Sequence, residues 1–173
     1  MKSLRLLISA FILFSGLHAS AQIQSVTLQA SGLTCSMCSR AIYKALEKVS
    51  DVASVQEDIE HTSYHIQFSD PGKISLENLK KAVTDAGFSV AWMEVKARFN
   101  QTEVASDSTL KLNEFVFYFV NISKQKLNGE RRLLIVDKDY LLEKDRKKYA
   151  GSYNTKAVGE GGEKIFHVTL PQS

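Results

Sequence analysis

Two cysteines three residues apart are the side chains whose type and spacing most directly imply chemistry. Cys35 and Cys38 form a Cys-x-x-Cys motif, and the 173-residue chain contains no other cysteine. A disulfide between them would close a very small loop, and the stabilisation that a disulfide gives a folded chain falls as the loop shortens. The pair is therefore poorly explained as a structural cross-link. Thiol–disulfide exchange and the binding of a soft metal ion are the two chemistries that suit it.

The motif lies between a predicted strand and a predicted helix. Polar and apolar residues alternate over 25–30, and apolar residues recur at helical spacing over 36–49. This order places Cys35 in the loop and Cys38 in the first helical turn. There, N–H groups without intrahelical partners and the positive end of the helix dipole favour a thiolate. Two thiolates in a loop favour a soft ion, with Cu(I) first and Hg(II) also attractive, while Ag(I) and Zn(II) are further possibilities.

The other potential ligands are weaker candidates. A structural zinc site normally takes four Cys or His ligands, and here only two thiolates exist, which suits transfer of an ion better than storage. Met37 occupies an x position of the motif, where an exposed, adaptable side chain is favoured over a thioether ligand. His61 and His65 flank Tyr64 on a predicted strand, and a second metal site there is conceivable but less favoured. His167 ranks lower still.

The elements that must position the motif follow a β-α-β-β-α-β order. Strands are predicted over 25–30, from residue 52, over 64–68 and over 88–95, and helices over 36–49 and from Ser75 to a C-terminal Gly87. Ser75 suits a helix N-cap, and Gly87 suits the position after a helix end. This order predicts an α+β, ferredoxin-like domain over residues 22–95.

The chain changes character from Lys96 onward, and we expect residues 96–173 to form a small β-rich α+β domain whose role the sequence does not assign. A turn-prone segment is predicted over 100–108, and strands are predicted over 115–120, 132–136 and 164–170. A charged helix is predicted over 140–149 and a glycine-rich loop over 158–162. The dense apolar run 115–120 suits a buried strand better than an edge strand.

Residues 1–21 have the pattern of a secretory signal peptide. Lys2 and Arg5 precede an apolar run over 6–17, and an A-x-A sequence ends the segment. The run is shorter than the roughly 20 residues that a membrane span needs, so an uncleaved anchor is the less favoured alternative. We expect a mature chain from Gln22 that is secreted, in the bacterial periplasm, without stable membrane insertion. Removing the two basic residues lowers the formal net charge from +3 to +1, which gives no electrostatic case for nucleic acid.

The sequence around the cysteines resembles a known family. Gly32-Leu33-Thr34-Cys35-Ser36-Met37-Cys38 resembles the G-M-T-C-x-x-C signature of heavy-metal-associated domains, which occur in copper chaperones and copper-transporting ATPases. The segments 45–55 and 79–88 resemble other parts of the family pattern, and the resemblance covers 22–95. It implies that Cys35 and Cys38 are the metal ligands. The resemblance also extends to the periplasmic mercury-binding protein, so Hg(II) stays a candidate for the bound ion.

Two departures from the family pattern are apparent. Leu33 replaces the usual Met, which preserves an apolar anchor, and Asp51 replaces a Gly before the second strand. Phe88 falls where the family places an aromatic side chain near the metal loop, so the resemblance gives it a supporting role.

Three functions remain open from the sequence. The leading one is a non-enzymatic Cu(I) carrier that passes its ion to a partner such as a copper-transporting ATPase or an efflux component, with an Hg(II) scavenger as its close alternative. The second is a thiol–disulfide oxidoreductase. Against it, the thioredoxin fold usually has an aromatic residue before the first cysteine, where this chain has Thr34, and a cis-proline facing the motif, for which neither Pro71 nor Pro171 is suitably placed. The third is an adaptor in which metal binding changes how the C-terminal half meets another protein.

Overall fold

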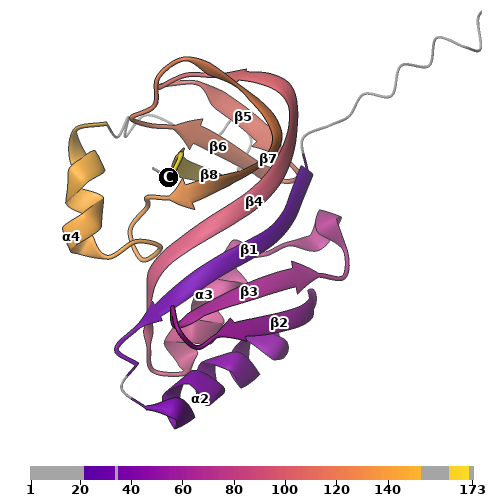
Figure 1. Ribbon diagram of the computed structural model, residues 1–173, viewed down its shortest axis with the longest axis vertical. Coiled ribbons are helices and arrows are strands. Elements are labelled where there is room, and N and C mark those ends of the chain that lie inside the picture. The colour runs from indigo at the N-terminus through magenta and orange to yellow at the C-terminus, as the bar shows by residue number, and fades with distance from the viewer. Residues whose placement is uncertain (1–21, 34, 153–163, 172–173) are drawn as a thin grey trace, which may run out of the picture.

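The computed structural model describes residues 22–33, 35–152 and 164–171. Over these ranges the chain forms one eight-stranded sheet in the order β2-β3-β1-β4-β7-β8-β6-β5 (Figure 1). The N-terminal elements are β1 (Gln22–Ser31), α2 (Ser36–Glu47), β2 (Val52–Asp58), β3 (Ser63–Phe68), the 3-10 turn η2 (Pro71–Lys73) and α3 (Leu76–Asp85). The remaining elements are β4 (Ser89–Val104), β5 (Thr109–Leu112), β6 (Phe115–Phe119), β7 (Gln125–Ile135), α4 (Glu143–Arg146), the 3-10 turn η3 (Lys147–Ser152) and β8 (Lys164–Thr169). The predicted signal peptide, Thr34 and the glycine-rich loop lie outside the described residues.

The N-terminal part has the predicted β-α-β-β-α-β order, and its ferredoxin-like fold is confirmed. Its four strands pair antiparallel, with β1 between β3 and β4. The predicted alternation is met on β1, where Val26 and Leu28 are fully buried while Thr27 between them is partly exposed. Both helices lie on the buried face of this part of the sheet, and each buries an apolar stripe there. None of the helices in the described ranges is long and apolar enough to cross a membrane.

Local sequence explains where α3 begins and ends. The hydroxyl of Ser75 accepts a hydrogen bond from the backbone N–H of Asn78 at 3.2 Å, as an N-cap side chain does. Gly87 follows the helix with φ = +89°, a conformation that side-chain-bearing residues rarely adopt. The backbone then turns directly into β4.

Strand β4 is longer than the sequence predicts, because it runs through residue 95 to Val104 and pairs with β7. Its alternation continues past that point: Ala97 and Phe99 are buried like Val95. An irregularity between Phe99 and Thr102, with Gln101 at φ = +48°, bends the strand without ending it. The segment predicted to be turn-prone therefore begins inside a strand, and the predicted boundary after Val95 falls within β4.

The C-terminal part is rich in sheet. The predicted strand over 115–120 is confirmed as β6, which lies between β8 and β5 and buries three phenylalanines: Phe115, Phe117 and Phe119. Strand β7 begins at Gln125, earlier than predicted, and β5 was missed. The helix predicted over 140–149 is shorter, since α4 begins at Glu143 and passes into η3. Tyr140 instead lies in a loop and is 4% exposed.

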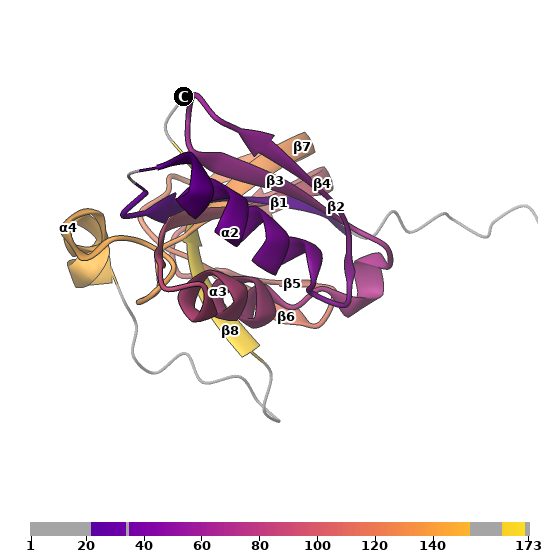
Figure 2. The ribbon, with the colours of Figure 1, turned by 90° about the horizontal axis from the view of Figure 1, so that it is seen from below.

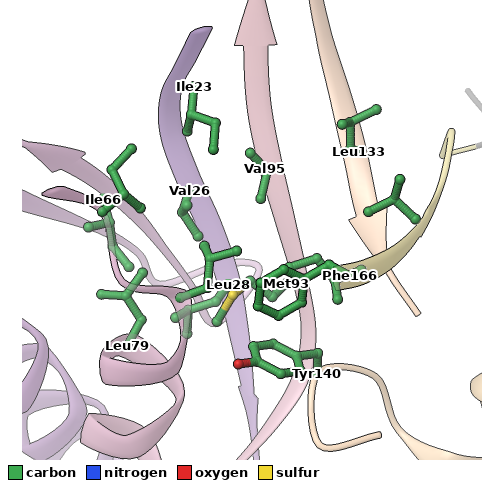
Figure 3. Close-up of a cluster of buried hydrophobic side chains, with 14 of the residues drawn as sticks. Ile23, Val26, Leu28, Ile66, Leu79, Met93, Val95, Leu133, Tyr140 and Phe166 are labelled. Atoms are coloured by element: carbon green, nitrogen blue, oxygen red, sulfur yellow. The ribbon is translucent and has the colours of Figure 1, made fainter. Parts of the chain in front are cut away.

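The two parts share a hydrophobic core. Side chains from β1, α3, β4 and β7 meet Tyr140 and Phe166 of β8 in one cluster (Figure 3). Strand β8 lies toward the flank of α3 (Figure 2), where Lys164 of β8 pairs with Glu77 of α3 at 3.1 Å. The ammonium of Lys80 lies 5.0 Å from the ring centroid of Tyr140. The division into domains 22–95 and 96–173 stays a prediction.

Candidate metal site

The thiol of Cys35 caps the N-terminus of α2. Cys35 has an extended backbone (φ = −152°, ψ = 156°), and its sulfur accepts a hydrogen bond from the backbone N–H of Cys38 at 3.3 Å. Its carbonyl oxygen accepts hydrogen bonds from the N–H groups of Cys38 (3.0 Å) and Ser39 (3.3 Å), which starts the helix. Cys35 therefore occupies the loop and Cys38 the first turn, as the sequence predicts.

This geometry favours the charged form of the first thiol. An interaction with the Cys38 side chain lowers the pKa of Cys35, and the backbone N–H of Cys38 lowers it further. A sulfur at a helix N-terminus also faces the positive end of the helix dipole. The thiolate is the form of cysteine that binds metals, and this geometry favours that form at Cys35.

The site is open to a partner molecule. Cys35 is exposed, Cys38 is partly exposed, and neither is in a disulfide. Met37 between them is 79% exposed, in agreement with the expectation of an exposed side chain at that position. Within the described ranges, no group of three or more Cys, His, Asp or Glu side chains is arranged to hold a metal ion. Two exposed thiols can bind a soft ion linearly and leave room for an incoming third ligand.

Elements behind the loop fix the position of the helix that carries Cys38. Ile42 and Leu46 on the inner face of α2 are fully buried. The hydroxyl of Tyr64, on β3, donates to the backbone carbonyl of Ser39 at 3.1 Å and ties the first turn of α2 to the sheet. Sequence reasoning missed this residue, although a tyrosine on the buried face of a strand needs a hydrogen-bond partner and so could have been flagged.

Two residues singled out by the family pattern pack against the main core. Leu33 and Phe88 are both partly buried there. The apolar anchoring expected of Leu33 is therefore met. The supporting role of Phe88 beside the cysteines stays a prediction. Arg40 is exposed on α2.

The histidines have partners away from the cysteines. His61 pairs with Asp58 (Nδ1 to Oδ2, 2.9 Å), and Nδ1 of His65 lies 3.1 Å from the hydroxyl oxygen of Thr27. In the C-terminal part, Nδ1 of His167 lies 2.8 Å from a carboxylate oxygen of Asp137. No observation joins His61 and His65 into the second metal site that the sequence left conceivable.

Comparison with known proteins bears on the same residues. The sequence model of the heavy-metal-associated domain matches residues 27–89. The chain is 40% identical over 68 residues to the mercuric transport protein periplasmic component of Serratia marcescens, and the match covers 39% of this chain and 74% of that protein. It is 27% identical over 63 residues to the copper chaperone CopZ of Staphylococcus epidermidis, over 36% of this chain and 91% of that protein. The crystal structure of oxidized MerP from Ralstonia metallidurans CH34 is 38% identical, with a TM-score of 0.37, and the match covers 40% of this chain and 94% of that one.

Two findings define the class. The N-terminal β-α-β-β-α-β module has two cysteines at the start of its first helix, and the chain has relatives of this identity and coverage. The chain belongs to the heavy-metal-associated domain family.

Proposed function

We propose that this protein is a carrier that binds Cu(I) through the thiolates of Cys35 and Cys38 in the bacterial periplasm and passes it to a partner protein. The observation that carries the proposal is the exposed sulfur of Cys35 at the N-cap of α2, held by the N–H of Cys38 at 3.3 Å. That sulfur is stabilised as a thiolate and accessible from outside. Membership of the heavy-metal-associated family supports the same assignment.

Transfer would proceed by ligand exchange and would need no enzymatic step. A thiolate of the partner approaches the ion on the exposed side of the loop and forms a three-coordinate intermediate. Cys35 or Cys38 then leaves, and a second partner thiolate completes the handover. The direction of transfer follows the relative affinities of the two proteins for the ion. A copper-transporting ATPase or an efflux component that presents paired thiols fits this role.

Mercury is the second candidate cargo. The relative named as a mercuric transport component shares 40% identity with this chain, while the copper chaperone shares 27%. Hg(II) is a soft ion that also prefers two thiolates, so the site chemistry accommodates both ions. The periplasmic part of the proposal also draws on that relative's name and on the signal-peptide pattern of residues 1–21.

The test is an anaerobic titration of the reduced protein with Cu(I) and, separately, with Hg(II), each against a competing chelator. One tightly bound equivalent should be present in the native protein and lost in both Cys35→Ser and Cys38→Ser. A Met37→Leu variant is the matched control in the same loop and should bind as the native protein does. Native-like binding in either cysteine variant would refute the site.

A parallel assay separates the carrier from an oxidoreductase with the same motif. Weak binding of both ions, together with catalytic reduction of insulin disulfides by the purified protein, would replace the carrier by a thiol–disulfide oxidoreductase.

A further inference from the structure

A groove on the face of the sheet opposite α2 and α3 is separate from the cysteine loop. Its lining includes Thr27 of β1, His65 of β3, Lys96 of β4, and Glu130, Arg131 and Arg132 of β7. Thr27 and Lys96 alternate with buried neighbours that face the helices, which places these two side chains on the outer face. Leu170 and Pro171, after β8, also line it.

Two positively charged residues of the groove lining lie opposite each other on neighbouring strands. Lys96 and Arg132 are directly opposite each other in the register of the antiparallel β4 and β7 pair. Like charges in this arrangement destabilise a sheet, and opposite charges would stabilise it. Each of the two cations has a carboxylate partner, and a bound anion between them would offset the repulsion that these partners leave.

The carboxylates nearby compensate only part of the positive charge. Glu130 is shared by two cations, since it lies 2.6 Å from the ammonium of Lys96 and 3.1 Å from the guanidinium of Arg98. Arg132 pairs with Glu94 at 3.3 Å. The side chain of Glu94 is 12% exposed, and burial raises its pKa, which weakens it as a counter-ion.

Basic residues outnumber acidic ones in this part of β4 and β7. Arg131 donates to the main-chain oxygen of Glu130 at 2.9 Å, an uncharged acceptor. The ionisable side chains of this stretch are four cations and two carboxylates, a formal excess of two positive charges: Lys96, Arg98, Arg131 and Arg132 against Glu94 and Glu130. The mature chain is close to neutral as a whole, so the excess is a local feature.

We infer that this groove binds a small organic anion bearing two or more carboxylate or phosphate groups, with Lys96 and Arg132 as its principal contacts. Guanidinium groups match the geometry of both oxyanions, and an ammonium adds a compact charge beside them. Thr27 and His65 of the lining supply polar groups for the rest of the bound anion. The proposal does not depend on the metal site, because none of its residues belongs to the cysteine loop.

The experiment is isothermal titration calorimetry of the metal-free Cys35→Ser/Cys38→Ser protein with citrate and, in a second arm, with inorganic phosphate. Removing both thiols prevents metal carried by the anion from contributing heat at the loop. Citrate should bind with one site per chain and more tightly than inorganic phosphate, which carries a single anionic group. An equal or higher affinity for inorganic phosphate would overturn the inference of a ligand with two or more such groups. In ¹H–¹⁵N spectra the ligand should shift the amide signals of Thr27, Lys96 and Arg132 and leave those of Ser36 to Ser39 in place.

Lys96→Gln is the variant that tests the groove. Glu130 keeps Arg98 as a partner when the ammonium is removed, so the variant leaves no unpaired carboxylate there. Loss of one charge-assisted hydrogen bond should weaken binding about tenfold. Lys126→Gln removes the same charge from β7 at a position outside the groove lining and should leave the affinity within about twofold. Absence of binding for both anions, or equal effects of the two variants, would overturn the inference.

Discussion

The sulfur of Cys35 combines two roles that usually belong to different residues. It closes the N-terminus of α2, a position that Ser, Thr, Asp and Asn normally fill, and it is also one of the two proposed metal ligands. The same N–H of Cys38 that satisfies the helix end stabilises the thiolate. The lowered pKa of Cys35 thus follows from its contacts with the side chain and the backbone N–H of Cys38 at the start of the helix.

The lowered pKa of Cys35 predicts fast alkylation at pH values where ordinary thiols are still protonated. A Cys38→Ala variant loses the larger contribution of the Cys38 side chain but keeps the backbone N–H donor at position 38, so the iodoacetamide reaction of Cys35 should reach half its maximal rate at a pH above that of the native protein and still below that of glutathione. The difference should disappear in urea, because the N–H donor is positioned only in the folded helix. A folded-state midpoint at or above the glutathione value would contradict the cap geometry.

Substitutions at Cys35 should separate capping from metal binding. Serine is a good N-cap, so Cys35→Ser should abolish metal binding while keeping the thermal midpoint of the native protein. Cys35→Ala removes both functions and should lower the midpoint by a few degrees. Circular dichroism melts of the two variants, recorded without metal, give this comparison. Equal midpoints for Ser and Ala would show that the sulfur does not stabilise the helix end.

At the scale of elements, the contact between β3 and α2 holds the loop in place. Tyr64→Phe removes the hydroxyl that donates to Ser39 and leaves the buried ring unchanged. Its loss should lower the free energy of unfolding by about 1 kcal/mol, which urea denaturation measures. Tyr43→Phe, at a half-exposed position of α2 where the hydroxyl interacts with the exposed Glu47, is the control and should have a smaller effect because water replaces that contact. A larger loss in the control would assign the stabilisation to the helix surface instead.

The elements also show what the sequence could and could not predict. Alternation and helix-end residues such as Ser75 and Gly87 are local signals, and they predicted each strand and α-helix of the N-terminal part, including the helix start that holds Cys38. The extension of β4 was missed even though Ala97 and Phe99 continue its alternation, and the irregularity at Gln101 obscures only its last residues. Strand β7 contains Gly129 at φ = +70° among polar residues, which obscured its first half. Tyr64's bond to Ser39 and the pairing of β4 with β7 are tertiary contacts, which no local pattern specifies.

At the scale of the whole molecule, the C-terminal part changes which surfaces of the metal-binding module remain open. Strand β7 covers the edge of β4, and Lys164 and Tyr140 contact the flank of α3. The cysteine loop and the outer side of α2 stay exposed. A partner that collects the ion is therefore expected to approach along α2 rather than along the edge of the sheet.

The shared core makes a prediction about cooperativity. Buried side chains of β1, α3, β4, β7 and β8 belong to one hydrophobic cluster, and β4 runs through both parts of the chain. Separating the parts would expose apolar surface on each, so the whole chain should unfold in a single transition. Trp92, the chain's one tryptophan, lies on β4 and reports on the junction by its fluorescence. Its urea midpoint should coincide with that of far-ultraviolet circular dichroism, which reports on all strands and helices. Two separate midpoints would instead support independent domains before and after residue 95. In that case β4 would have to lose its pairing with β7 while keeping its pairing with β1.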